Sequence, residues 1–288
     1  MEGVIEDSLI AVSLVMHREQ PALESCPDSQ SHSEVAMSDD SVLFDLTNGV
    51  GTITYNRPDR HNAISDEMGA RSTQILTEAI ANPDVKVIVL RGAGKSFCSG
   101  RDTTQLGTRA QGESDFEFVR RAQNNRLMVM DAPKPVIAAV RGWAIGGGLE
   151  TALACDIRFA SPDIKLRMPE INYGLLPDTG GTQFITTLAT PSRAKLMIMS
   201  GEVITADEAL AWGLVDRIVP TEELFDYVQR FAENLATKSP VGLAMAKQMI
   251  DSSWIGAARE GMRQELNAQI VMFAERDKQG AVRGEYAK

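Results

Sequence analysis

The chain has 288 residues, of which 43% are hydrophobic and 24% are charged, so it is long enough for a globular enzyme with a sizeable core. Its formal net charge of -10 argues against nucleic acid and anionic membranes as partners, because both attract a surplus of Lys and Arg. Its three cysteines form no disulfide framework and its three histidines lack metal-ligand spacing, so we expect a cytoplasmic protein without a metal site.

Residues 1–40 differ in composition from the rest of the chain. The segment Glu19–Asp40 is rich in Ser, Asp, Glu and Gln and has little periodic hydrophobicity, which predicts a disordered or flexible tail. Met37 stands just before the first strand pattern, and our hypothesis is that translation starts there; a genuine flexible tail is the alternative. The longest apolar stretch near the start, Leu9–Met16, is far shorter than the roughly 20 residues of a membrane span.

From Ser41 onward, hydrophobic periodicity predicts strands that alternate with helices. Asn48-Gly49 joins two short strands and is a hairpin signal. Ser65 is a plausible N-cap for a helix over 66–81. Buried strands alternating with helices indicate an α/β architecture, built here as a spiral of similar strand–turn–helix units. The predicted strands are Val42–Leu46, Gly51–Tyr55, Val85–Leu90, Val136–Val140 and Ile157–Ala160.

The last third of the chain is predicted to be helical. Thr205 and Glu208 form a capping box that opens one helix, which ends at Gly213. Thr221 is expected to cap the next helix, and Ser239-Pro240 to start another. A final amphipathic helix is predicted over Gly261–Arg276, and such an appendage often makes subunit contacts.

Two glycine-containing turns each follow a buried strand and carry the candidate chemistry. The first is Ser96–Asp102, and the second is Gly142–Glu150, which runs into a helix over Thr151–Cys155. Glycine lets a ligand approach backbone N–H groups closely, and a helix N-terminus adds unpaired donors and a positive dipole end. Two such donors that converge on one oxygen would form an oxyanion hole for an enolate. Glu150 lies beside these donors, and Glu170 offers a second carboxylate.

These residues resemble the crotonase superfamily, which includes enoyl-CoA hydratases and isomerases. The resemblance spans Ser41–Lys288, and its specificity lies in the order and spacing of several short motifs. The motifs are Asn56-Arg57-Pro58 with Asn62-Ala63, Phe97–Asp102, Gly146–Glu150, Pro169-Glu170, Gly180–Gln183 and Ala209–Val219.

The resemblance implies a ββα spiral catalytic core over 41–204 and a helical region over 205–288 that is used to form a homotrimer or a dimer of trimers. It implies an acyl-CoA thioester as substrate and no separate cofactor, because coenzyme A is part of the substrate. It also implies that the N–H groups of Ser99 and Gly147 form the oxyanion hole. The residues expected to bind substrate are Ser99, Gly100, Arg101, Asp102 and Gly147.

In hydratases of the family, glutamates at the positions of Glu150 and Glu170 handle a water molecule. Glu170 would exchange the proton at the α-carbon, and Glu150 would orient and activate the water. The leading hypothesis is therefore an enoyl-CoA hydratase, which adds water reversibly and in the syn sense to a trans-2-enoyl-CoA. Acyl chain length is left open, because Thr103–Gln123 is interpreted as a variable polar helix or loop.

Asp178 departs from the simplest hydratase pattern, because many hydratases have a small residue there. Dienoyl-CoA isomerases and some dehalogenases of the superfamily place a functional acid at this position, so the first alternative is an isomerase with Asp178 as a third catalytic residue. A purely structural alternative is that Asp178 caps the following helix. A second functional alternative is a non-catalytic acyl-CoA- or RNA-binding relative, against which both glutamates and the acidic charge argue. Arg101 stands where alanine is common and is expected to be a solvated charge or one that faces coenzyme A, and not a catalytic group.

Overall fold

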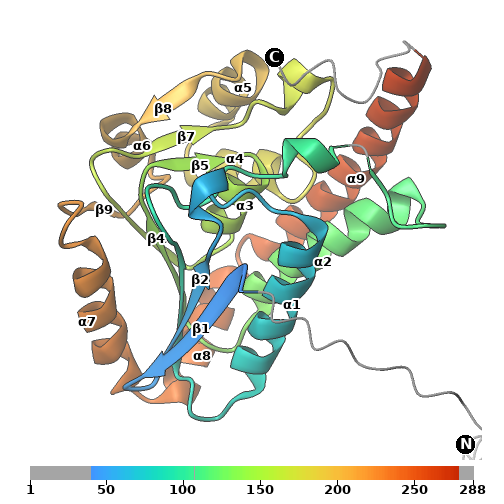
Figure 1. Cartoon of the computed structure of the whole chain (residues 1–288). Coiled ribbons are helices and arrows are strands. Elements are labelled where there is room, and N and C mark those ends of the chain that lie inside the picture. The colour runs from blue at the N-terminus through green and yellow to red at the C-terminus, as the bar shows by residue number, and fades with distance from the viewer. Residues whose placement is uncertain (1–39, 107, 279–288) are drawn as a thin grey trace, which may run out of the picture. The chain divides into compact units, whose positions relative to one another are not determined.

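The computed structural model describes residues 40–106 and 108–278 (Figure 1). The predictions for the N-terminal tail and for Met37 lie outside these residues. The strands are β1 (Val42–Thr47), β2 (Val50–Tyr55), β3 (Val87–Gly92), β4 (Val136–Val140), β5 (Trp143–Ile145), β6 (Ile157–Ala160), β7 (Lys165–Arg167), β8 (Val203–Thr205) and β9 (Arg217–Ile218). The α-helices are α1 (Asp66–Ala81), α2 (Asp115–Asp131), α3 (Gly147–Leu153), α4 (Gly181–Leu188), α5 (Pro191–Ser200), α6 (Ala206–Trp212), α7 (Leu224–Ala236), α8 (Pro240–Asp251) and α9 (Ile255–Lys278). Three short 3-10 turns are η1 (Pro58–Arg60), η2 (Thr103–Gln105) and η3 (Glu170–Tyr173).

The larger sheet has the strand order β1-β2-β3-β4-β6-β9. Strands β1 and β2 pair antiparallel across the predicted turn, where Asn48 and Gly49 both have positive φ angles. Every later pair in this sheet is parallel. The smaller sheet has the strand order β5-β7-β8. Its strands β5 and β7 directly follow β4 and β6 of the larger sheet along the chain. The α/β fold predicted from the strand runs is thus confirmed.

Both faces of the central strands are buried, which explains their continuous apolar runs. On β3, Val87 and Val89 pack with Leu224 and Val228 of α7. The alternate residues of β3, including Ile88, belong to the main core together with α1. Figure 1 shows α7 and α1 on opposite sides of this sheet.

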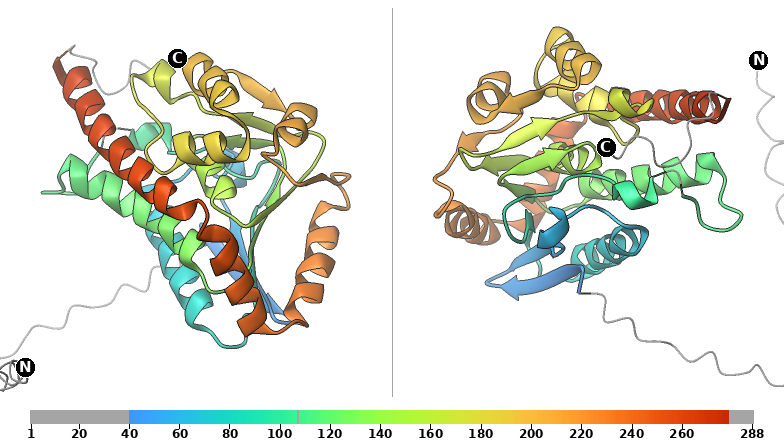
Figure 2. Two further views of the ribbon diagram at one scale, coloured as in Figure 1. Left: turned by 180° about the vertical axis from the view of Figure 1, so that it is seen from behind. Right: turned by 45° about the horizontal axis from the view of Figure 1, so that its top comes forward.

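Helices α2 and α9 lie side by side, as both views in Figure 2 show. Val119 of α2 packs with Leu266 and Phe273 of α9, and Phe118 meets Phe273 edge to face. This pair of helices forms one wall of the cavity described below.

Several predicted helix boundaries hold. Ser65 caps α1 by accepting a hydrogen bond from the Met68 N–H, and the capping box of Thr205 and Glu208 opens α6. The prediction for Thr221 is wrong: α7 starts after Glu223, and the Thr221 hydroxyl instead hydrogen-bonds Asp163. Helix α2 occupies the last part of Thr103–Gln123, where a variable polar helix or loop was expected, and continues to Asp131. Within the described part of the chain, no helix is long and apolar enough to cross a membrane.

Candidate active site

The two glycine turns are joined by backbone hydrogen bonds. The Cys98 N–H donates to the Trp143 carbonyl at 3.0 Å, and the Ile145 N–H donates to the Cys98 carbonyl at 3.0 Å. A methyl group on Gly148 would lie 2.3 Å from the Cys98 carbonyl oxygen, so α3 can approach this closely only with glycine there. The turn after β3 is therefore held against the N-terminus of α3.

Gly100 makes the closest approach between these turns. Its φ angle is +84°, and a methyl group there would lie 2.6 Å from the Ile145 carbonyl oxygen and 3.5 Å from the Gly147 nitrogen. Gly147 is the first residue of α3, where helix N–H groups have no partner within the helix. Within the described residues, neither its N–H nor that of Arg101 makes a hydrogen bond. Two free donors thus line one cavity.

Ser99 was expected to provide one of the oxyanion donors, but its N–H donates to the His61 carbonyl at 3.0 Å. The Ser99 hydroxyl also points away from the turn, to the Arg60 carbonyl. Gly100, which separates Ser99 from Arg101, has a φ angle of +84°, so the backbone turns there. The donor that is free to face a ligand is therefore the Arg101 N–H, which makes no hydrogen bond among the described residues.

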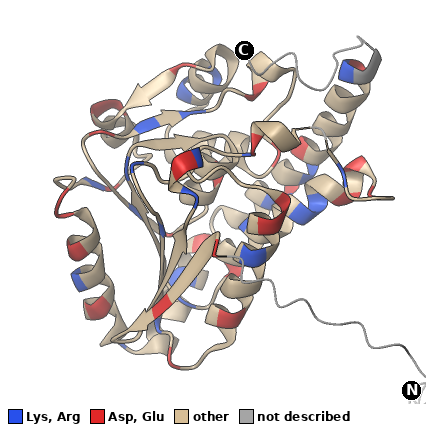
Figure 3. Cartoon of the chain, viewed as in Figure 1, with Lys and Arg blue, Asp and Glu red and all other residues tan. Residues whose placement is uncertain are grey.

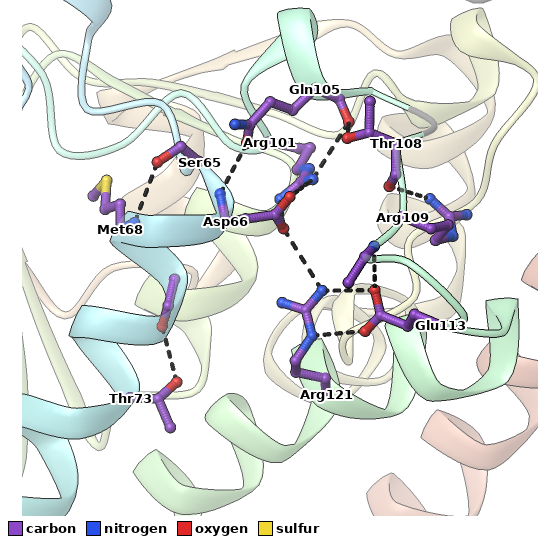
Figure 4. Close-up of polar contacts among 12 residues, drawn as sticks. Ser65, Asp66, Met68, Thr73, Arg101, Gln105, Thr108, Arg109, Glu113 and Arg121 are labelled. Atoms are coloured by element: carbon purple, nitrogen blue, oxygen red, sulfur yellow. Dashed lines mark hydrogen bonds and ion pairs between the residues drawn. The ribbon is translucent and has the colours of Figure 1, made fainter. Parts of the chain in front are cut away.

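The side chains of Arg101 and Asp102 have partners within the protein. Arg101 binds both carboxylate oxygens of Asp66, at 2.8 and 3.1 Å, and Arg121 approaches the same carboxylate (Figure 4). Asp102 pairs with Arg57 at 2.9 Å and caps η2. Both residues line the cavity, but Asp102 serves chiefly to brace the turn.

The Glu150 side chain is almost completely buried, and three hydrogen bonds hold its carboxylate in place. One carboxylate oxygen accepts hydrogen bonds from the N–H groups of Thr179, at 3.0 Å, and Gly181, at 2.8 Å. The other oxygen accepts from the Thr179 hydroxyl. A carboxylate offers about four lone-pair positions, so one position remains for a further donor such as water.

Glu265 of α9 binds the same turn from the other side and was not singled out from the sequence. Its carboxylate accepts from the Gly180 N–H at 2.7 Å, the Thr182 N–H at 2.9 Å and the Thr182 hydroxyl. Burial, followed by the nearby Glu150, raises the pKa of Glu265 to about 8. Alternate amides at the start of α4 are thus bound by Glu150 and by Glu265. The sequence signal that could have identified Glu265 is its position as a charged residue on the buried face of a predicted amphipathic helix.

Glu170 begins η3 and lines the same cavity as Glu150. Burial, followed by the Glu150 carboxylate, raises the pKa of Glu170 to about 8. Its Oε2 atom is buried without a hydrogen-bond partner in the described part of the molecule. A methyl group on Gly146 would lie 2.3 Å from the Oε1 atom, so glycine there leaves room for this side chain.

Asp178 also lines the cavity, and it does not cap the following helix. The N-cap of α4 is Gly180, with no side-chain cap bond, so the structural alternative for Asp178 is wrong. Burial, followed by Glu150, raises the pKa of Asp178 to about 7. The structure therefore brings Glu150, Glu170 and Asp178 to one cavity.

The cavity has a volume of about 900 Å³, large enough for a sizeable organic ligand. Seven arginines line it, against the four carboxylates of Asp102, Glu150, Glu170 and Asp178. Figure 3 shows that Lys and Arg are interspersed with Asp and Glu along the ribbon. Such a lining favours an anionic ligand. The arginines are Arg60, Arg101, Arg109, Arg121, Arg126, Arg167 and Arg276.

Comparison with known proteins identifies a matching family and several relatives. The family model described as enoyl-CoA hydratase/isomerase matches residues 45–287. An (E)-benzylidenesuccinyl-CoA hydratase of Thauera aromatica is 37% identical over 208 residues, which are 72% of this chain and 80% of that protein. A 1,2-epoxyphenylacetyl-CoA isomerase of Escherichia coli strain K12 is 35% identical, over 74% of this chain and 82% of its own.

Solved structures of enoyl-CoA hydratases and hydratase/isomerases have a similar fold. An enoyl-CoA hydratase/isomerase from Xanthobacter autotrophicus Py2 has a TM-score of 0.75 at 27% identity, and the match covers 85% of this chain and 97% of that one. An enoyl-CoA hydratase from Bacillus anthracis has a TM-score of 0.70 at 31% identity, over 80% of this chain and 91% of that one. The matched proteins thus carry names of both hydratases and isomerases.

Proposed function

Because the chain belongs to the enoyl-CoA hydratase/isomerase family, we propose that its pocket binds an acyl-CoA thioester and that it hydrates a trans-2-enoyl-CoA. The observation that carries this proposal is the arrangement of Glu150 and Glu170 on one cavity. Glu150 keeps one lone pair free for water, and Glu170 has an unpaired oxygen and a raised pKa. One carboxyl suits a base and the other an acid.

In the proposed reaction the thioester oxygen accepts hydrogen bonds from the N–H groups of Gly147 and Arg101. Both donors are free and lie on adjoining turns, which supports Arg101 in place of Ser99. The hydrogen bonds from these donors strengthen as the thioester oxygen becomes enolate-like. Removing one such donor typically lowers kcat by about 10²–10³-fold. The arginine lining suits the phosphates of coenzyme A.

The proton transfers follow from the two carboxyl groups. Water held by Glu150 forms a bond to the β-carbon as Glu150 takes one of its protons. Glu170, protonated, gives its proton to the α-carbon. One molecule of water is thereby added, and proton exchange between the carboxyls and solvent resets them. General acid–base help of this kind contributes roughly 10²–10⁴-fold.

A second candidate is a double-bond isomerase, favoured by Asp178. This carboxyl has no capping role, lines the cavity and has a pKa of about 7. Asp178 and Glu170 form a pair in which one group removes a proton from the substrate and the other returns a proton at a different carbon. This requires no added water.

The test is loss of the enoyl-thioester absorbance when crotonyl-CoA is added to the purified protein. The variants are Glu150→Gln, Glu170→Gln and Asp178→Asn, with Glu260→Gln on the exposed face of α9 as a matched control. Hydration abolished by either glutamine change but kept in Asp178→Asn supports the hydratase. No hydration by the native protein, with turnover of shifted-alkene or dienoyl-CoA substrates that depends on Asp178, replaces it with the isomerase.

A further inference from the structure

Arg126 is a buried arginine in the wall of the cavity, and it has no ionic partner there. Its side chain comes from α2, and only 7% of the residue is exposed. One terminal nitrogen donates to the Gly147 carbonyl at 2.7 Å and the other to the Asn125 side chain at 3.0 Å. The Nε atom is buried without a hydrogen-bond partner in the described residues. Burying a guanidinium is costly unless its charge is compensated.

The other arginines contributed by this side of the cavity are paired. Arg101 binds Asp66 at 2.8 Å, Arg109 binds Asp115 at 3.0 Å and Arg121 binds Glu113 at 2.9 Å. For Arg126 no carboxylate lies within ion-pair distance among the residues that the structure describes. Arg167 of the cavity is likewise in no ion pair among the described residues, but its Nε atom donates to the Gly201 carbonyl at 2.6 Å, whereas the Nε atom of Arg126 has no such partner there.

Arg126 lies beside the reacting groups. A methyl group on Gly147 would lie 3.3 Å from the Nη2 atom of Arg126 and 4.0 Å from the Oε2 atom of Glu150. The guanidinium and the catalytic carboxylate thus flank the start of α3, where the thioester oxygen is proposed to bind. The first carbons of an acyl chain leave the thioester at this place, within reach of the guanidinium.

The wall around Arg126 is polar as well. The Asn125 amide donates to the Thr73 hydroxyl at 3.1 Å, and Ser72 and Tyr55 also line the cavity. A plain alkyl chain would leave the positive charge of Arg126 without a counter-charge, which disfavours it. A planar carboxylate matches the guanidinium, because two parallel hydrogen bonds and an opposite charge are offered at once.

Building on the proposed function, we propose that the preferred substrate is an acyl-CoA whose acyl group carries a carboxylate a few carbons from the thioester, and that Arg126 binds this carboxylate. Two of the three neighbouring acids carry reduced negative charge near neutral pH. The raised pKa values of Glu170, about 8, and Asp178, about 7, keep much of their population protonated there. Glu150 already receives three hydrogen bonds.

The test is calorimetric binding of saturated ligands, which cannot be hydrated. Succinyl-CoA is compared with 4-methylpentanoyl-CoA, and glutaryl-CoA with 5-methylhexanoyl-CoA, because an isopropyl group has nearly the shape of a carboxylate. The proteins are the native chain, Arg126→Met, Arg126→Lys and the control Arg120→Met, an exposed arginine on the same helix. We expect the native protein and the control to bind at least one carboxylate ligand about tenfold or more tightly than its isostere. Arg126→Met should lose this preference, and Arg126→Lys should keep part of it.

Two outcomes overturn the inference. One is a native protein that binds both branched ligands as tightly as the carboxylates. The other is an Arg126→Met variant that weakens both members of a pair equally, which indicates that Arg126 only braces the Gly147 carbonyl. The native comparison decides even when the variants do not fold. If branched acyl-CoAs bind without a carboxylate preference, only this inference fails, whereas absence of binding by every acyl-CoA and of any turnover refutes the proposed function itself.

Discussion

Glu265 offers a direct test of how the catalytic carboxylate is held in place. In Glu265→Ala, the N–H groups of Gly180 and Thr182 lose their acceptor, while the Thr182 hydroxyl can rotate toward another. A buried donor left without a partner costs about 1–3 kcal/mol, so two cost about 2–6 kcal/mol. Water entering the vacated space recovers part of this, and we expect about 3 kcal/mol. Such a loss is a large fraction of the roughly 5–15 kcal/mol that stabilises a typical domain.

The same change should reach the chemistry, although Glu265 does not line the cavity. Thr179 and Gly181, which hold Glu150, alternate with the residues that Glu265 holds. Loosening this turn shifts Glu150, and a displacement of about 1 Å can cost on the order of 10²-fold in rate. Urea unfolding and kcat with crotonyl-CoA measure both effects, with Glu260→Ala as the exposed control on the same helix. If Glu265→Ala matches that control in stability and kcat, the reasoning is refuted.

Three further predictions concern titration, backbone and assembly. Because the pKa of Glu170 is raised to about 8 and the reaction needs one proton on the pair of glutamates, kcat/KM for hydration should fall as pH rises through about 8. The kcat/KM for dehydration should fall in parallel, because the ratio of the two is the equilibrium constant of a reaction that releases no proton; a hydration profile that stays level through about pH 8 would contradict this role of Glu170. Gly100→Ala should lower kcat by about 10²–10³-fold, because the added methyl group meets the Ile145 carbonyl and displaces the neighbouring donor. The control Gly112→Ala has a similar φ of +80°, but open space surrounds the added methyl group, so it should change only the free energy of unfolding, by about 1 kcal/mol. Helix α8 exposes Met245 and Met249, so light scattering should give the mass of a trimer or hexamer, reduced in a Met245→Lys/Met249→Lys variant; a native monomer would exclude this interface.

The sequence predicts the parts of the fold whose side-chain pattern is simple. The runs at β4 and β6 were placed at their observed bounds, because strands buried on both faces are largely apolar; β4 is apolar throughout, and β6 departs from this only at the buried Arg158. For Thr103–Gln123 the sequence left a helix or a loop open and did not predict that a helix continues to Asp131, since the buried face of α2 includes the polar residues Gln123, Asn125 and Arg126. Helix prediction relies on an apolar stripe, and a polar pocket wall lacks one.

The candidate site was only partly predictable for a related reason. Glu150 and Glu170 were located from the sequence because each lies in a short motif, Gly146–Glu150 and Pro169-Glu170. The assignment of Ser99 as an oxyanion-hole donor could not be tested from the sequence alone. Which N–H group of a turn faces a ligand depends on the carbonyl groups packed against it, and here the His61 carbonyl binds the Ser99 N–H. Glu265 was missed because its partners lie more than 80 residues earlier in the chain.

The shared turn at the start of α4 also bears on biosynthesis. Glu150 reaches its position only through Thr179 and Gly181, and that turn is completed by Glu265 in the last described helix. A ribosome makes the sheet strands and both catalytic glutamates long before α9 emerges. During that interval the nascent chain holds its acids without the clamp that positions them. Termination of translation is therefore expected to precede the first turnover, and a chain that loses α9 to a premature stop should be inactive even where its sheet is intact.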